Sequence, residues 1–278
     1  MTPLRQAAGT VVLCLALALL SLAPLRAGAD DGVDRLYTAL KLPEMIALMR
    51  DEGMAQSESL AFDYLAFPPG DSWAQLMRRI YDPAKMEAAM KAAFRSDIEG
   101  AEIAPLIDFF QGETGSRIAE LELDARRAFL DPATEEAARR QVSDPDTPAS
   151  RLALIDRYIE VNDLVEFNVM GALNSNYRFY QGLTETGTFE MTDEEMLAEV
   201  WAQEAQTRSD TISWLRAFLL MAYEPLSDDD LRAYVDLSAT EPGQRLNSAL
   251  FMGFERMYND VYHALGLAVA YQMSGQDL

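Results

Sequence analysis

Apolar residues recur at intervals of three and four along nearly the whole chain, and this spacing is the strongest constraint on its fold. The clearest run comprises Leu246, Leu250, Phe254, Met257, Val261 and Leu265. Such spacing places the apolar side chains on one face of an α-helix. The sequence shows no convincing run of alternating β-branched residues, and no Asn-Gly or Asp-Gly pair that joins two such runs into a hairpin. The pattern therefore predicts an all-α helical bundle.

Several helix starts are marked by a capping side chain. A capping residue stands before a proline at Asp82-Pro83, Asp131-Pro132 and Thr147-Pro148. Proline suits the first helical position, where its missing N–H costs nothing. Thr192 with Glu195, and Ser227 with Asp230, have the spacing of capping boxes or close variants. The acidic runs at these two starts also match the positive end of the helix dipole, so they need no metal to explain them.

Three stretches rich in glycine, proline or polar residues predict breaks between helices: residues 67–70, 143–146 and 182–187. The middle one divides the chain into comparable parts. We therefore expect a first helical half at residues 30–142, a linker at 143–149 and a second helical half at 150–278.

The two halves resemble each other around a helix–turn–helix segment. Residues 98–121 align with 226–249, and the identical pairs are Asp108/Asp236, Glu113/Glu241, Gly115/Gly243 and Arg117/Arg245. This similarity predicts duplication of one helical unit, with both copies packed into a common core. In the second copy Thr240 is placed to cap the following helix. The glycines Gly115 and Gly243 fall in the first turn, where glycine costs helix stability, so we expect a close backbone contact there.

The turn segment also resembles a known family. Residues 109–115 read Phe109-Phe110-Gln111-Gly112-Glu113-Thr114-Gly115. This segment is similar to the Phe-Tyr-x-Ser-Pro-x-Gly segment of the bacterial domain-of-unknown-function 2059 family, with Phe for Tyr and Gly-Glu for Ser-Pro. The second copy keeps the hydroxyl of Thr240 and the glycine but lacks the aromatics. The resemblance implies an all-helical exported protein without an established biochemical role, and it supplies no catalytic residue.

The N-terminal residues have the organisation of a signal peptide. Arg5 precedes an apolar run at residues 11–25, and small residues at Ala27 and Ala29 precede Asp30. We expect cleavage between Ala29 and Asp30, which makes residues 1–29 the leader and places the mature protein in the periplasm or, alternatively, outside the cell. The run is short for a membrane anchor. A lipoprotein would use Cys14, but Leu13 before it is not a small residue.

The composition of residues 30–278 excludes several functions. The whole chain carries a formal charge of −22, and removing the leader removes two arginines, so the mature chain is more acidic still. This charge disfavours binding to nucleic acid and to anionic membrane surfaces. Cys14, the only cysteine, lies in the leader. Disulfides, thiolate catalysis and cysteine-ligated metals are therefore excluded from the mature chain.

The sequence contains no recognisable catalytic, cofactor or metal motif. His263 is the only histidine, and Asp260 three residues earlier would give at most half of a metal site. We interpret His263 as an ordinary residue on a helix surface. Gly-x-Ser-x-Gly, phosphate-binding and dinucleotide-binding motifs are absent.

Methionine and tyrosine residues at helical spacing are compatible with either a core or a groove. They are Met45, Met49, Met86, Met90, Tyr258, Tyr262 and Tyr271. The leading hypothesis is a non-enzymatic module that binds another periplasmic protein or an envelope component. Two alternatives are a carrier of a small apolar ligand or lipid between helices, and a hydrolase that uses paired carboxylates. An open groove would favour a protein partner, an enclosed cavity a ligand, and a cleft with converging acids an enzyme.

Overall fold

The computed structural model describes residues 23–65, 70–187 and 189–275. Every regular element in these ranges is an α-helix, which confirms the predicted all-α class. In chain order the helices are α1 (Ala23–Ala39), α2 (Leu42–Tyr64), α3 (Asp71–Ile80), α4 (Pro83–Ile98), α5 (Ala104–Gln111), α6 (Glu113–Ala128), α7 (Pro132–Val142), α8 (Ala149–Val161), α9 (Leu164–Thr184), α10 (Asp193–Ala202), α11 (Glu204–Tyr223), α12 (Asp228–Ser238) and α13 (Glu241–Met273).

Most of the predicted leader, residues 1–22, lies outside the described residues. The expected cleavage site, Ala27, Ala29 and Asp30, falls within α1. The signal peptide and its cleavage therefore stay predictions.

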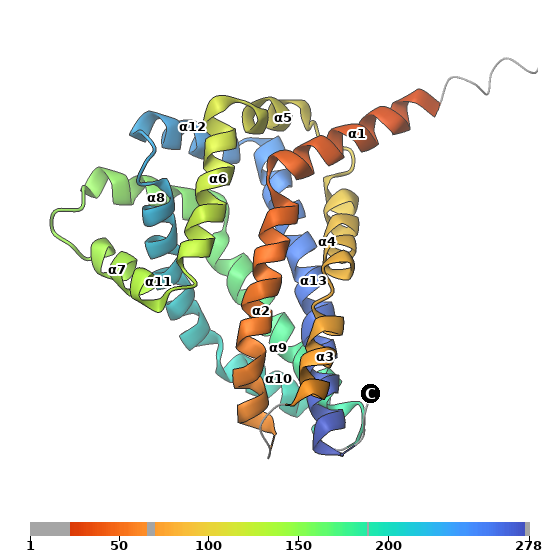
Figure 1. The fold of residues 1–278 in the computed structure, drawn as a ribbon. Coiled ribbons are helices and arrows are strands. Elements are labelled where there is room, and N and C mark those ends of the chain that lie inside the picture. Colours follow the sequence, from red (N-terminus) through yellow and green to blue (C-terminus); the bar gives the residue numbers. More distant parts are fainter. Residues whose placement is uncertain (1–22, 66–69, 188, 276–278) are drawn as a thin grey trace, which may run out of the picture.

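The long helix α13 is the centre of the fold. It packs most extensively against α9 and α4, which come from different predicted halves (Figure 1). Glycines permit the close packing on both sides: Gly253 lies against Met90 of α4, and Gly266 and Gly182 lie at the crossing of α13 with α9. A glycine at a crossing lets two helix backbones approach each other directly, because no Cβ separates them.

One continuous cluster of buried residues runs through the molecule, from Leu36 on α1 to Ala270 on α13. It includes side chains from both predicted halves, such as Phe94 on α4 and Leu183 on α9. A smaller cluster of Val169, Leu173 and Val200 fixes α10 on the outer side of α9. Apart from α10, the described helices thus share a common hydrophobic core.

Five of the predicted helix caps are present, among them Thr240 at α13. Asp82 accepts hydrogen bonds from the first amides of α4, and Asp131 does so for α7. Thr192 and Glu195 form a complete capping box at α10, and Ser227 accepts from the Asp230 amide at α12. These bonds satisfy amides that have no partner within the helix.

Two local predictions are wrong. Thr147 does not cap a helix: its hydroxyl donates to the carbonyl of Gln141 at 2.7 Å and closes the turn after α7, while α8 begins at Ala149. Gly182 does not begin a break either, because α9 continues to Thr184 and Gly182 is buried against α13. The turn itself uses Gly187, whose φ of 71° favours glycine.

Candidate functional site

The residues of the repeated motif lie in two similar turns, between α5 and α6 and between α12 and α13. Thr240 caps α13 by accepting from the amide of Gly243 at 3.1 Å, whereas Gly112 begins α6 without a side-chain cap. A Cβ on Gly115 would lie 2.6 Å from the carbonyl carbon of Phe109. A Cβ on Gly243 would lie 2.9 Å from that of Leu237. Both glycines therefore sit directly on the backbone of the preceding helix.

Other motif residues of the first copy contact α12 and the turn that precedes it. Phe109 stacks on Tyr234 of α12 with ring centroids 5.8 Å apart, and Phe110 meets the same ring edge-on at 6.0 Å. Arg117 donates to the carbonyl of Pro225 at 2.9 Å. Arg245 is exposed and lines a shallow depression beside the turn between α4 and α5. These contacts give most motif residues a packing role.

The single histidine makes a simple surface contact. His263 Nε2 lies 3.0 Å from a carboxylate oxygen of Glu185, and Asp260 pairs with Arg256. Within the described ranges no group of three or more His, Cys, Asp or Glu side chains is placed to hold a metal ion.

A cleft of about 620 Å³ opens between α2, α9 and α13, with contributions from Tyr81 after α3 and Arg126 on α6. This volume lies within the range of about 300–1,000 Å³ that is typical of small-molecule sites. The cleft is the candidate functional site.

Aromatic side chains form much of the cleft wall. On α13 they are Phe251, Phe254, Tyr258 and Tyr262, which share one helix face because they are three, four and seven residues apart. Phe167 on α9 stacks on Phe251 with ring centroids 4.5 Å apart and an angle of 11° between the rings. Such side chains offer a large apolar surface with polar tips only at the tyrosines.

A paired arginine and glutamate contribute charge to the cleft. Arg126 donates from Nε and Nη2 to the two carboxylate oxygens of Glu52, at 2.7 and 2.6 Å. The guanidinium also lies over the ring of Trp214, 5.8 Å from its centroid. Burial raises the pKa of Tyr258 to about 12, with Arg126 opposing the shift. The positive charge of Arg126 is thus balanced by Glu52 within the protein. The bidentate geometry of this pair is typical of the stronger ion pairs.

The other acids of the cleft have different partners. Glu166 pairs with Arg208 at 2.8 Å, and the hydrogen bond from Arg208 lowers the pKa of the Glu166 carboxyl. Glu255 accepts a hydrogen bond from the side-chain amide of Asn174 at 2.6 Å. Asp163 is exposed and begins α9 with a positive φ of 49°. Among these acids only Glu255 stands within the aromatic face of α13.

A second polar cluster lies away from the cleft, between α6, α8, α11 and α12. Glu122 accepts hydrogen bonds from the hydroxyls of Tyr223 at 2.5 Å and Tyr234 at 3.4 Å, and Tyr158 donates to Tyr234 at 2.9 Å. Burial raises the pKa of the Glu122 carboxyl, although the two tyrosine hydroxyls oppose the shift. The surrounding rings fill the space around the carboxyl, so the cluster serves the packing of four helices.

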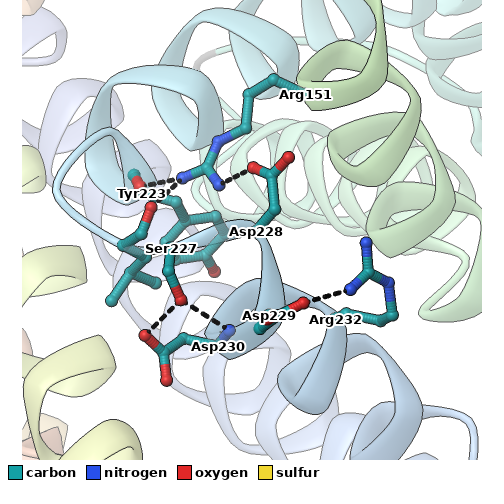
Figure 2. Close-up of polar contacts among 8 residues, drawn as sticks. Arg151, Tyr223, Ser227, Asp228, Asp229, Asp230 and Arg232 are labelled. Atoms are coloured by element: carbon teal, nitrogen blue, oxygen red, sulfur yellow. Dashed lines mark hydrogen bonds and ion pairs between the residues drawn. The ribbon is translucent and has the colours of Figure 1, made fainter.

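A third cluster fixes the turn between α11 and α12. Figure 2 shows Arg151 of α8 pointing at this turn, where it donates to the Tyr223 and Leu226 carbonyls and to Asp228 at 2.7 Å. Beside it, the hydroxyl of Ser227 donates to the Asp230 carboxylate and accepts from the Asp230 amide (Figure 2). Arg151 is buried, and its hydrogen bonds hold the turn between α11 and α12 in place.

Sequence reasoning identified some residues of the cleft and missed others. Met49, Tyr258 and Tyr262 line it, whereas Met86 and Met90 are core residues. The importance of Arg126, Glu52 and Glu255 was not predicted. Arg126 and Glu52 are 74 residues apart in the chain, and no local pattern links them. The available signal was a single acid, Glu255, inside an otherwise aromatic helix face.

In the part of the chain that the structure describes, no helix has the length and apolar character needed to cross a membrane. Comparison with protein-family models, with curated proteins and with solved structures gave no match. The resemblance of residues 109–115 to the domain-of-unknown-function 2059 family therefore stays a prediction.

Proposed function

We propose that this chain is a non-enzymatic binding protein of the cell envelope that holds a small amphipathic ligand in the cleft between α2, α9 and α13. The observation that carries the proposal is the cleft itself: about 620 Å³, partly open, with aromatic walls and a few fixed polar groups. Small-molecule sites combine these same features. The periplasmic location rests on the predicted leader, residues 1–29.

The geometry gives less support to a carboxylate hydrolase. Such enzymes need one acid that stays protonated and a second that converges on the same bond. In the cleft Glu52 and Glu166 are each held by an arginine. The pairing with Arg208 lowers the pKa of Glu166, which is the opposite of what a general acid requires.

Gly171 provides a clean test of the cleft. It lines the cleft from the middle of α9, and a Cβ at this position would meet no atom within 4 Å. A large side chain here extends into open space without disturbing the core. Gly171→Phe should therefore fill part of the cleft and leave the fold intact, while the matched variant Gly171→Ala adds a single methyl group.

The experiment compares binding of an uncharged amphipathic probe, octanol, by the wild type and both variants. We expect Gly171→Phe to weaken octanol binding about tenfold or more, since a phenyl ring displaces a comparable volume of ligand. Gly171→Ala should bind within about twofold of the wild type. If octanol binds equally well to Gly171→Phe, or binds to none of the three proteins, the cleft is not the ligand site.

A second candidate function, binding to a protein partner, is favoured by one surface on α10. Leu197 and Trp201 are one helical turn apart and expose 44% and 55% of their surfaces. Exposed tryptophans of this kind are frequent anchors of protein interfaces. A photo-crosslinking amino acid at Trp201 should give one discrete adduct in cells if this surface is used. The same group at Arg140, on a charged and exposed part of α7, is the control; equal labelling from both positions would remove the candidate.

A further inference from the structure

We infer that the cleft is selective for an organic cation, with its ammonium group at Glu255 and its apolar body against the aromatic walls. This inference rests on the proposed ligand-binding function and adds the charge of the ligand to it. It follows from which charges in the cleft already have partners and which do not.

Among the described residues that line the cleft, the only basic one already has an acidic partner. Arg126 directs two of its nitrogens to Glu52, at 2.7 and 2.6 Å. An anionic ligand would have to displace Glu52 from this pair, which would leave a carboxylate with little exposure without its partner. The cleft is therefore poorly suited to fatty acids, phosphates and other anions.

Glu255 is in the opposite situation. Its described partner is the neutral amide of Asn174, at 2.6 Å, and no lysine or arginine of the described chain forms an ion pair with it. Glu166, by contrast, is paired with Arg208. The carboxylate of Glu255 is half-buried, so a cation that reaches it is less screened by water than at an open surface.

The rings around Glu255 favour the same kind of ligand. Phe251 lies four residues before it and Tyr258 three residues after it on the same helix face, and Phe167 extends the wall from α9. Aromatic faces attract ammonium groups through the ring quadrupole, and they pack equally well on alkyl or aryl bodies. A carboxylate within an aromatic wall therefore recognises both parts of a lipophilic amine.

The test uses three probes with the same body and different charge: octylammonium, octanol and octanoate. Their dissociation constants are measured by calorimetry at pH 7 and 0.15 M NaCl, where long-range attraction to the acidic protein is screened. Glu255→Gln keeps the size of the side chain and its bond to Asn174 but removes the charge. Asp260→Asn is the matched control, because it removes one charge from the same helix outside the cleft lining.

We expect octylammonium to bind about tenfold more tightly than octanol, and octanoate more weakly than both. In Glu255→Gln the advantage of octylammonium over octanol should disappear, and Asp260→Asn should keep that advantage as in the wild type. Equal binding of the three probes would overturn the inference and leave the proposed function standing. Preference for octanoate, or an ammonium preference that survives Glu255→Gln, would also overturn it. Binding of none of them would overturn both proposals.

Discussion

The crossing of α9 and α13 predicts that a substitution which normally stabilises a helix will destabilise this one. Gly182 on α9 and Gly266 on α13 face each other reciprocally across the two backbones. A Cβ at Gly182 would overlap the carbonyl oxygen of His263 and lie 2.8 Å from the amide nitrogen of Leu267. Real Cβ atoms essentially never approach other atoms within 3.0 Å, so Gly182→Ala must push the helices apart.

The magnitude follows from two opposing terms. Alanine in place of glycine inside a helix gains about 0.5–1 kcal/mol from the lower conformational entropy of the unfolded chain. Forcing a methyl group into a closed contact costs about 1–3 kcal/mol. The obstructing atoms are backbone of α13 and no rotamer change can move them, so we take the upper part of that range. Gly182→Ala should then lower the free energy of unfolding by about 1–2 kcal/mol, or the melting temperature by roughly 2–8 °C for a chain of this size.

Gly171→Ala is the matched control, since it makes the same chemical change on the same helix, where a Cβ meets no atom within 4 Å. Only the helix term applies there, and the melting temperature should rise by about 1–4 °C. Circular dichroism at 222 nm during heating measures both variants. A Gly182→Ala protein as stable as the wild type, or shifted in the same direction as Gly171→Ala, would refute the argument from close backbone contact.

Three further predictions concern the other clusters. Because burial raises the pKa of Glu122, its contribution to stability is complete only below its ordinary pKa of 4.5 and is lost as the pH rises through the raised value; Glu122→Gln should flatten this decline in urea-unfolding free energies measured between pH 4 and pH 8. Arg151→Met leaves the Tyr223 and Leu226 carbonyls without their donor, and denaturation should show a loss of about 2–4 kcal/mol. Gly243→Leu overlaps the end of α12 and should lower the melting temperature, whereas an unchanged value would contradict the packing described at this turn.

The features that sequence predicted well are those decided by neighbouring residues. The caps at Asp82, Asp131 and Thr192 depend on a side chain two or three residues from the amide that it accepts, so the sequence contains both partners. Thr147 was predicted to cap the next helix but does not cap α8. Its hydroxyl donates instead to the carbonyl of Gln141, six residues earlier. A threonine hydroxyl can either cap a helix or bond a nearby carbonyl, and the geometry of the turn decides which of the two forms.

The cleft could not be predicted because its residues come together only when distant helices pack. Met49, Phe167 and Phe251 show ordinary helical spacing, and each is as compatible with a core as with a groove. Whether such residues belong to the core or to a groove depends on which faces of their helix are covered by neighbouring helices. On α13 the side that carries Gly253 is covered by α4 and the side that carries Gly266 is covered by α9, whereas the aromatic face is only partly covered.

The two glycine-bearing turns of the predicted duplication share one backbone contact that the alignment does not show. Gly115 and Gly243 each sit on the carbonyl of the residue six positions earlier, although the helices that follow them differ greatly in length: α6 has 16 residues and α13 has 33. The shorter helix α6 packs against α5 and against α11 of the second half, whereas the longer α13 packs against α4 and α9 together. At the shift of the alignment, the last residue of α6, Ala128, matches Arg256 of α13, so Tyr258 and Tyr262 of the cleft wall lie in the part of α13 for which the first copy has no counterpart. Phe251 and Glu255 lie within the matched part.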